Sequence, residues 1–112
     1  MGKPDAVDII IHLTFAAFLM FAASIFIVPQ HIDDVFYKYV NQSELRRPPF
    51  MGLSMDADGT AYNGSPIIIL INNKALLVNW SLRHENCHAR QFMENRKVNE
   101  FECYARMMLP WE

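Results

Sequence analysis

The ten residues RHENCHARQF, positions 83–92, decide how the rest of this chain is interpreted. They place His84 and His88 one helical turn apart, so that in a helix both imidazoles leave the same face and can close on one metal ion. Glu85 projects about 100° further around the helix axis, beside that ion rather than onto it. This is the H-E-x-x-H pattern of two zinc ligands and a general base. The alternative is a chance pair of histidines on a polar helix face.

The sequence around this motif predicts two helices. Apolar periodicity indicates a first helix from about 80 to 95, and a second from about 100 to 109 that ends at Pro110. The connection between them is short, so the second helix is expected to fold back across the first as an antiparallel hairpin.

A third metal ligand is expected on the second helix, because a catalytic zinc normally takes three protein ligands and leaves one position for water. On that helix Glu102 shares a face with small and apolar residues, namely Val98, Ala105 and Leu109. If this face packs inward, Glu102 needs either a cationic partner or a metal, since an unpaired buried carboxylate is costly. We therefore favour Glu102 as the third ligand. Its rival is Glu100, which lies about 200° away on the wetter side.

The segments HENCHARQ, 84–91, and NEFECYAR, 99–106, together resemble the gluzincin zinc metallopeptidases, whose small members carry H-E-x-x-H-x-x-Q and then F-E-x-x-A. The resemblance implies a thermolysin-like core reduced to a sheet and two helices, with SPIIIL, 65–70, as the edge strand. It implies a zinc site whose ligands are His84, His88 and Glu102, with Glu85 as base and Gln91 in a supporting position. Two departures are the short spacing between His88 and Glu102 and a chain too small for a separate substrate-binding lobe.

An apolar segment precedes this region. Residues 7–28, VDIIIHLTFAAFLMFAASIFIV, carry one charge, at Asp8. Residues 9–28 match the roughly 20 apolar residues that span a bilayer core, so we expect one continuous membrane helix in contact with lipid and without partners in the rest of the chain. A signal peptide is less favoured because the exit lacks the small-residue cleavage pattern, although FAAS at 21–24 keeps cleavage open. A buried soluble helix is disfavoured because too little chain remains to cover it.

The side of the membrane is weakly indicated. More cations follow the apolar segment, at Lys38, Arg46 and Arg47, than precede it, where Lys3 stands with the free amino group. Cations gather on the cytoplasmic side, so the count leans toward a cytoplasmic C-terminal part.

Between the apolar segment and the motif, residues 31–49 are expected to form a juxtamembrane linker. Val35 and Tyr39 could lie on a short amphipathic helix at the membrane surface, or the segment could be a simple tether. Residues 50–71 indicate β structure, with turns at DADG and NGSP and a continuous apolar run, PIIILI, of strand length. The following KALLV fits either a returning strand or the start of a helix.

Two cysteines, Cys87 and Cys103, fall on the two predicted helices. Two cysteines do not make a disulfide scaffold, and we expect two ordinary buried thiols. A disulfide and a zinc-perturbed thiol are the alternatives.

The chain is therefore predicted to be α+β, with an N-terminal membrane anchor at 1–30, a linker at 31–49 and a minimal zincin-like domain at 50–112. That domain would hold a short antiparallel sheet, the active-site helix and a second helix with the third ligand. The net charge of −2 and the lack of a basic patch argue against nucleic acid as a partner. The expected function is a single-pass, membrane-anchored peptidase that uses Zn²⁺ to hydrolyse a peptide or protein substrate. The alternative is a non-catalytic membrane-anchored accessory or interaction protein with a structural or vestigial zinc site.

Overall fold

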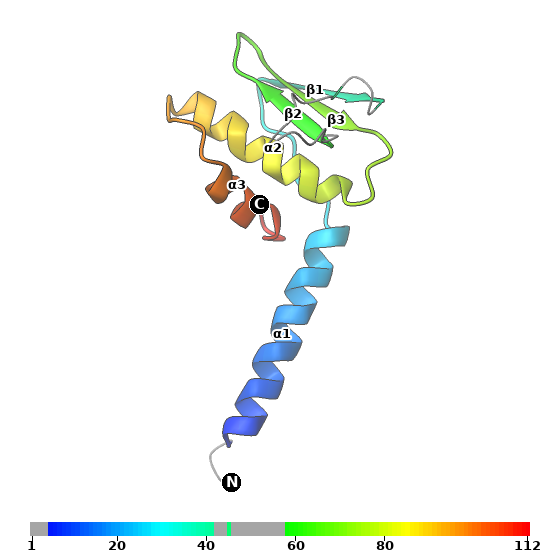
Figure 1. Ribbon diagram of the computed structural model, residues 1–112, viewed down its shortest axis with the longest axis vertical. Coiled ribbons are helices and arrows are strands. Elements are labelled where there is room, and N and C mark those ends of the chain that lie inside the picture. The colour runs from blue at the N-terminus through cyan, green and yellow to red at the C-terminus, as the bar shows by residue number, and fades with distance from the viewer. Residues whose placement is uncertain (1–4, 42–44, 46–57) are drawn as a thin grey trace, which may run out of the picture.

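A computed structural model of the chain describes residues 5–41, 45 and 58–112. It shows a long N-terminal helix that carries a small α+β unit at its C-terminal end (Figure 1). The elements, in order, are α1 (Ala6–Phe26), β1 (Val35–Val40), β2 (Gly59–Tyr62), β3 (Ile67–Asn72), α2 (Val78–Met93) and α3 (Glu100–Met107). The predicted α+β class is confirmed, while most of the predicted β segment before residue 58 lies outside the described residues.

Helix α1 is long and apolar enough to cross a membrane, and little of it is buried against the rest of the chain. Asp5 caps its start by accepting a hydrogen bond from the Asp8 amide at 2.8 Å. The helix ends at Phe26 because Ile27 turns into extended backbone, so it stops two residues before the predicted boundary.

The three strands form a mixed sheet in the order β1-β3-β2, in which β1 runs parallel and β2 antiparallel to β3. This corrects three expectations. The sheet is not purely antiparallel, β3 is its centre rather than its edge, and the segment assigned to a linker contributes β1. The aromatic and β-branched sequence VFYKYV suits a strand, and pairing with β3 satisfies its backbone groups in a way that a surface helix would not.

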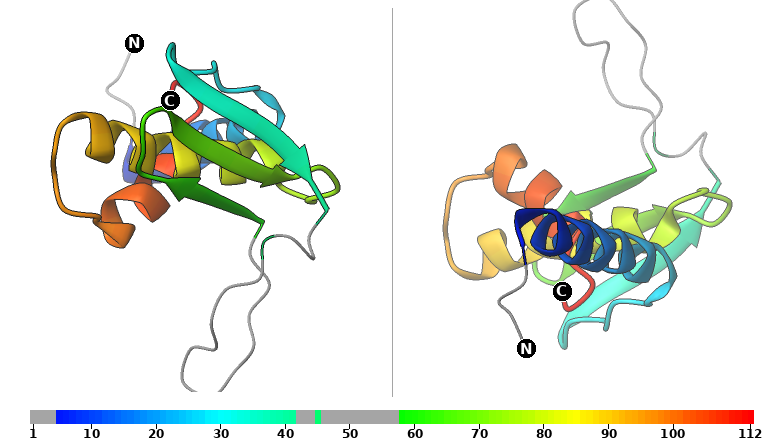
Figure 2. Two further views of the ribbon diagram at one scale, coloured as in Figure 1. Left: turned by 90° about the horizontal axis from the view of Figure 1, so that it is seen from above. Right: turned by 90° about the horizontal axis from the view of Figure 1, so that it is seen from below.

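Helix α2 lies across one face of the sheet, and α3 packs on the other side of α2 (Figures 1 and 2). The contact between sheet and α2 is a small apolar core of Ile69, Ile71, Leu82 and Ala89, all buried. Helix α3 and the C-terminus lie on the same side of α2 as α1 (Figure 1).

The last turn of α1 is tied to α2 by polar side chains. Arg83, fully buried, donates from Nη1 to the Ser24 carbonyl and from Nη2 to the Ile27 carbonyl at 2.5 Å. Asn79 donates to the Ile25 carbonyl at 2.8 Å, and Trp80 donates to the Ser24 hydroxyl at 2.9 Å. The last carbonyls of a helix lack intrahelical donors, and the negative end of the helix dipole favours a nearby cation. The Arg83 guanidinium supplies both the hydrogen-bond donors and the positive charge. The expectation that the membrane helix has no partner in the chain is wrong for this turn.

We expect Arg83→Met to loosen the junction between α1 and α2. The substitution keeps an apolar stem of similar length but removes the donors, and each lost hydrogen bond to a charged group costs about 1.5–3 kcal/mol. The full chain in detergent should melt more than about 5 °C lower by circular dichroism, and protease should cut residues 27–34 faster. Lys97→Met, which removes an exposed cation, is the control. Equal melting of the two variants would contradict this role.

Candidate metal centre

His84 and His88 of α2 and Glu100 of α3 converge on one point. The two Nε2 atoms are 3.1 Å apart, and the Glu100 carboxylate oxygens lie 3.2 Å from His84 Nε2 and 2.9 Å from His88 Nε2. These residues offer one ligand atom each, all within 4.8 Å of one another. Around a tetrahedral zinc with bonds of about 2.0–2.1 Å, ligand atoms are separated by about 3.3 Å. The three side chains therefore fit the ion with little rearrangement.

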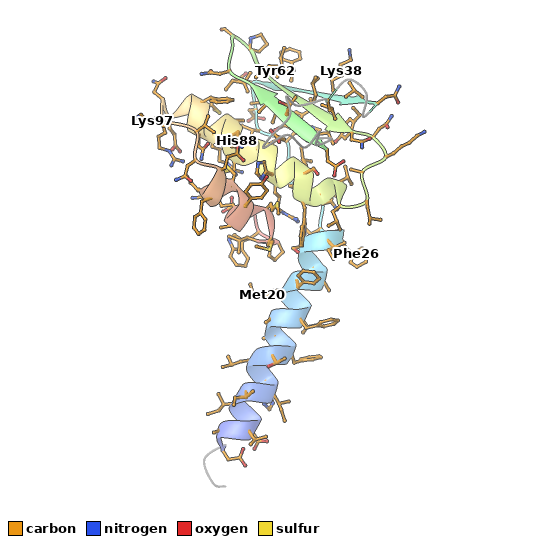
Figure 3. The ribbon with its side chains drawn as sticks, viewed as in Figure 1. Met20, Phe26, Lys38, Tyr62, His88 and Lys97 are labelled. Atoms are coloured by element: carbon orange, nitrogen blue, oxygen red, sulfur yellow. A yellow bond between two sulfur atoms is a disulfide. The ribbon has the colours of Figure 1, made fainter. Side chains whose placement is uncertain are left out.

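The two histidines converge because they stand one turn apart on α2. Their rings meet edge to face with centroids 4.8 Å apart, and both residues are 5 % exposed. Figure 3 shows His88 between α2 and α3. The side-chain oxygen of Gln91 lies 3.0 Å from His88 Nδ1. When Nδ1 donates this hydrogen bond, the ring orientation is fixed and the Nε2 lone pair is left for a metal.

Gln91 also connects the site to the start of α3. Its side-chain nitrogen donates to the Asn99 carbonyl at 3.2 Å, and its oxygen accepts from the Asn99 amide at 3.2 Å. Asn99 in turn caps α3 by accepting from the Glu102 amide at 3.1 Å. Because Glu100 follows this cap directly, the network from His88 to Asn99 sets the position of the third ligand.

Glu102, the expected third ligand, does not reach the histidines. Its carboxylate accepts hydrogen bonds from Arg96 at 3.0 and 3.2 Å and from Gln91 at 3.1 Å, and it pairs with Arg106 at 3.2 Å. The hydrogen bonds from Arg96, and next that from Gln91, hold the pKa of Glu102 below its usual range. The cationic partner that its position required is thus arginine, and the choice of Glu102 over Glu100 was wrong.

The cause of this error is the rotation of α3 about its axis. The prediction assumed that the small and apolar face with Ala105 turns inward. In the structure Cys103 is the residue of α3 that is fully buried, whereas Ala105 is exposed. Glu100 lies about 60° from Cys103 around a helix of 100° per residue, and Glu102 about 100° to the other side. The inward face therefore carries Glu100 toward α2.

A disulfide between Cys87 and Cys103 joins α2 to α3. The expectation of two ordinary buried thiols is therefore wrong. The structure has the disulfide, which was one of the two alternatives. Cys87 immediately precedes His88 in the sequence, and Cys103 Sγ lies 3.5 Å from His88 Nδ1. The covalent link between the helices thus adjoins the metal cluster, and it removes both sulfurs from the set of available ligands.

Glu85 lies outside the cluster, on the side of α2 that faces the sheet. It is 2 % exposed, and a Cβ atom added to Gly59 of β2 would come within 2.9 Å of Glu85 Cγ. Gly59 therefore leaves the space that Glu85 occupies between α2 and the edge strand. Glu85 was expected beside the ion rather than on it, and in the structure it does not belong to the three-ligand cluster.

Tyr104 covers the outer side of the cluster. Its ring centroid lies 4.5 Å from that of His84, and the residue is half exposed. A second phenol, that of Tyr62, stands exposed on β2 (Figure 3). Of these two phenols, Tyr104 is thus the one that contacts a histidine of the site.

Two imidazoles and one carboxylate form a donor set typical of catalytic zinc. Comparisons of the chain with protein-family models, curated proteins and solved structures found no match. The chemistry of this site is therefore inferred from its own geometry.

Substitutions of the two carboxylates of α3, Glu100 and Glu102, should differ in their effect on zinc affinity. We expect Glu100→Ala to weaken zinc binding more than about 100-fold, because a lost ligand should cost at least as much as the roughly 10–100-fold for a supporting contact. Glu102→Gln, the matched control, should change affinity less than about tenfold, because it alters only the contacts with Gln91 and the arginines. Competition with a chromogenic chelator measures both. The reverse order would restore Glu102 as the ligand.

Reduction of the disulfide should loosen the site. The cysteines are 16 residues apart in sequence, and closing a loop of about this length contributes about 3 kcal/mol. A phosphine reductant should therefore lower the free energy of unfolding in urea by that order and weaken zinc binding, since α3 carries Glu100. A double Cys87→Ala, Cys103→Ala variant should not respond to the reductant. Unchanged zinc affinity in the reduced wild type would count against this coupling.

Proposed function

We propose that the chain is a membrane-anchored zinc metallopeptidase that hydrolyses peptide bonds. The observation that carries this proposal is the convergence of His84, His88 and Glu100 on one point, with spacing suited to tetrahedral zinc. Helix α1 has the length and composition of its anchor.

The cluster resembles a catalytic rather than a structural zinc site. Structural sites take four protein ligands, whereas catalytic ones keep a position for water. Among the residues that the structure describes, the cluster has three members, and the nearby cysteines are engaged in the disulfide. The Glu100 side chain is 49 % exposed, which favours access for water and substrate.

A zinc ion at these ligands would polarise a peptide carbonyl and lower the pKa of a bound water to about 7. Glu85 is the proposed general base, which takes a proton from the attacking water and delivers it to the leaving amine. Its burial between α2 and Gly59 holds the carboxylate away from bulk water and close to the edge strand. In this scheme Gln91 holds the ring of His88, and Glu100 and the histidines hold the ion.

The substrate would align along β2 rather than along β3, the strand that was expected at the edge of the sheet. β3 is paired on both sides, whereas β2 pairs with β3 alone among the described strands. An extended peptide can add to such an edge through backbone hydrogen bonds. Because Gly59 of β2 leaves the space that the Glu85 side chain occupies, this edge lies next to the proposed base.

We further propose that the α+β unit lies on the oxidising side of the membrane. Disulfides persist in extracellular and periplasmic spaces and are reduced in the cytosol. The Cys87–Cys103 disulfide therefore outweighs the small excess of cations that leaned toward the cytoplasm.

The alternative is an accessory protein in which the same cluster only clamps α3 to α2. It is favoured by the position of Glu85, which is 2 % exposed on the sheet side of α2 and does not belong to the three-ligand cluster. Both functions expect zinc, and only the peptidase needs Glu85 as a base.

The test is Glu85→Gln in the full chain. This change keeps size and hydrogen bonding but removes the base, so zinc content should remain and cleavage of an extended peptide should fall about 10²–10⁴-fold. Glu94→Gln, at the exposed end of α2, is the matched control and should cleave like wild type. Metal analysis and mass spectrometry of the products measure both. Equal behaviour of zinc-loaded wild type and Glu85→Gln would support the accessory protein.

A further inference from the structure

Helix α3 turns its apolar side outward. Its exposed apolar and aromatic residues form one face with the C-cap residue Met108, and we call this the outer face of α3: Phe101, Tyr104, Ala105 and Met108. Phe101 is 84 % exposed. The charged residues Glu102 and Arg106 lie instead on the half-buried side, where they pair with each other. A surface helix of a soluble protein normally has the opposite arrangement, so the outer face requires an apolar partner.

The C-terminal end of α3 lies beside the end of α1. Arg83 Nη1, which binds the Ser24 carbonyl, also approaches the Met107 carbonyl at 3.5 Å, so one guanidinium joins the C-terminal ends of α1 and α3. Figure 1 shows α3 and the C-terminus on the side of α2 from which α1 extends. The C-terminal end of α3 is thus held at the level where the apolar helix α1 ends.

The C-terminal tail continues this surface. Glu112 pairs with Arg90 of α2 and Arg106 of α3, both at 3.1 Å, and these pairs hold the tail in place. Trp111 is 66 % exposed, and it borders a cavity of about 450 Å³ together with Ile27 and Val28. Val28 and Phe26, at the exit of α1, are 70 % and 79 % exposed. Exposed apolar side chains therefore continue from α1 to the tail.

We propose that the outer face of α3 and Trp111 lie in the interfacial layer of the membrane that α1 spans, so that the metal site opens at the lipid surface. Tryptophan and tyrosine are enriched at this level, and short amphipathic helices lie there with their apolar side toward the acyl chains. A second copy or another protein could cover the same face. The bilayer is favoured because the exposed end of α1 continues into this surface, and anchoring through α1 keeps the two together at high local concentration.

This position determines what the site meets. Glu100 and Tyr104 are separated by about 40° around α3, so the third ligand stands at the border of the outer face. Substrates would be polypeptide segments at the membrane surface rather than chains in bulk water. The inference rests on the proposed membrane anchor, and its test uses fluorescence rather than catalysis.

The experiment places single tryptophans in the full chain, reconstituted at one copy per nanodisc of phosphatidylcholine with or without brominated acyl chains. Each reporter stands in a Trp80→Phe, Trp111→Phe background. Phe101→Trp reports the outer face of α3, Phe15→Trp reports the middle of α1, and Tyr62→Trp reports the exposed end of β2, away from α1 (Figure 3). If the Trp80→Phe background does not fold, the difference between wild type and Trp111→Phe gives the signal of Trp111.

Brominated lipid should quench Phe101→Trp at least about twofold, because an interfacial helix buries its apolar face about 5–10 Å into the headgroup boundary. Phe15→Trp should also be quenched, and Tyr62→Trp should not. If Phe15→Trp is quenched while Phe101→Trp behaves like Tyr62→Trp, the anchor stands and this inference is overturned. A Phe101→Trp signal that is blue-shifted, insensitive to bromine and dependent on protein concentration would assign the face to a second copy, which also overturns it. If brominated lipid does not quench Phe15→Trp, both the proposed membrane anchor and this inference are contradicted.

Discussion

The Cys87–Cys103 disulfide is the constraint on which the site depends, because it fixes how α3 is rotated against α2. With Cys103 turned inward, Glu100 faces the two histidines and Glu102 faces the arginines. The same rotation leaves Phe101 and its neighbours outside. In a helix of only eight residues, one covalent contact is enough to decide the direction of every side chain.

Helix α2 contacts the sheet, α1 and α3, and the side chains that it presents to each of them differ in chemistry. Its apolar residues Leu82 and Ala89 pack on the sheet, and Arg83 binds the end of α1. The face toward α3 holds His84 and His88. Several buried polar side chains of this helix have partners on the surrounding elements. Arg83 binds the end of α1, Asn86 accepts from the Tyr37 hydroxyl of β1, and the two histidines face Glu100 of α3.

These contacts couple the proposed catalytic centre to the proposed anchor. Arg83 and His84 are adjacent in sequence, and one binds the carbonyls of α1 while the other faces Glu100. The candidate metal site therefore lies close to the end of the helix that would anchor the chain in the membrane. Such an arrangement suits an enzyme whose substrates lie at a fixed height above the bilayer.

The sequence by itself determined the features that depend on local spacing. These are the long apolar helix, the strand at PIIILI, the two C-terminal helices and the pairing of His84 with His88 on one face. Only the tertiary structure decided the rest. β1 needed β3 as a distant parallel partner, and local pattern does not specify such pairing. The choice of Glu100 over Glu102 depended on the rotation of α3, which apolar periodicity predicted wrongly. Periodicity finds the apolar face of a helix, but whether that face meets protein or another apolar surface depends on what surrounds the folded chain.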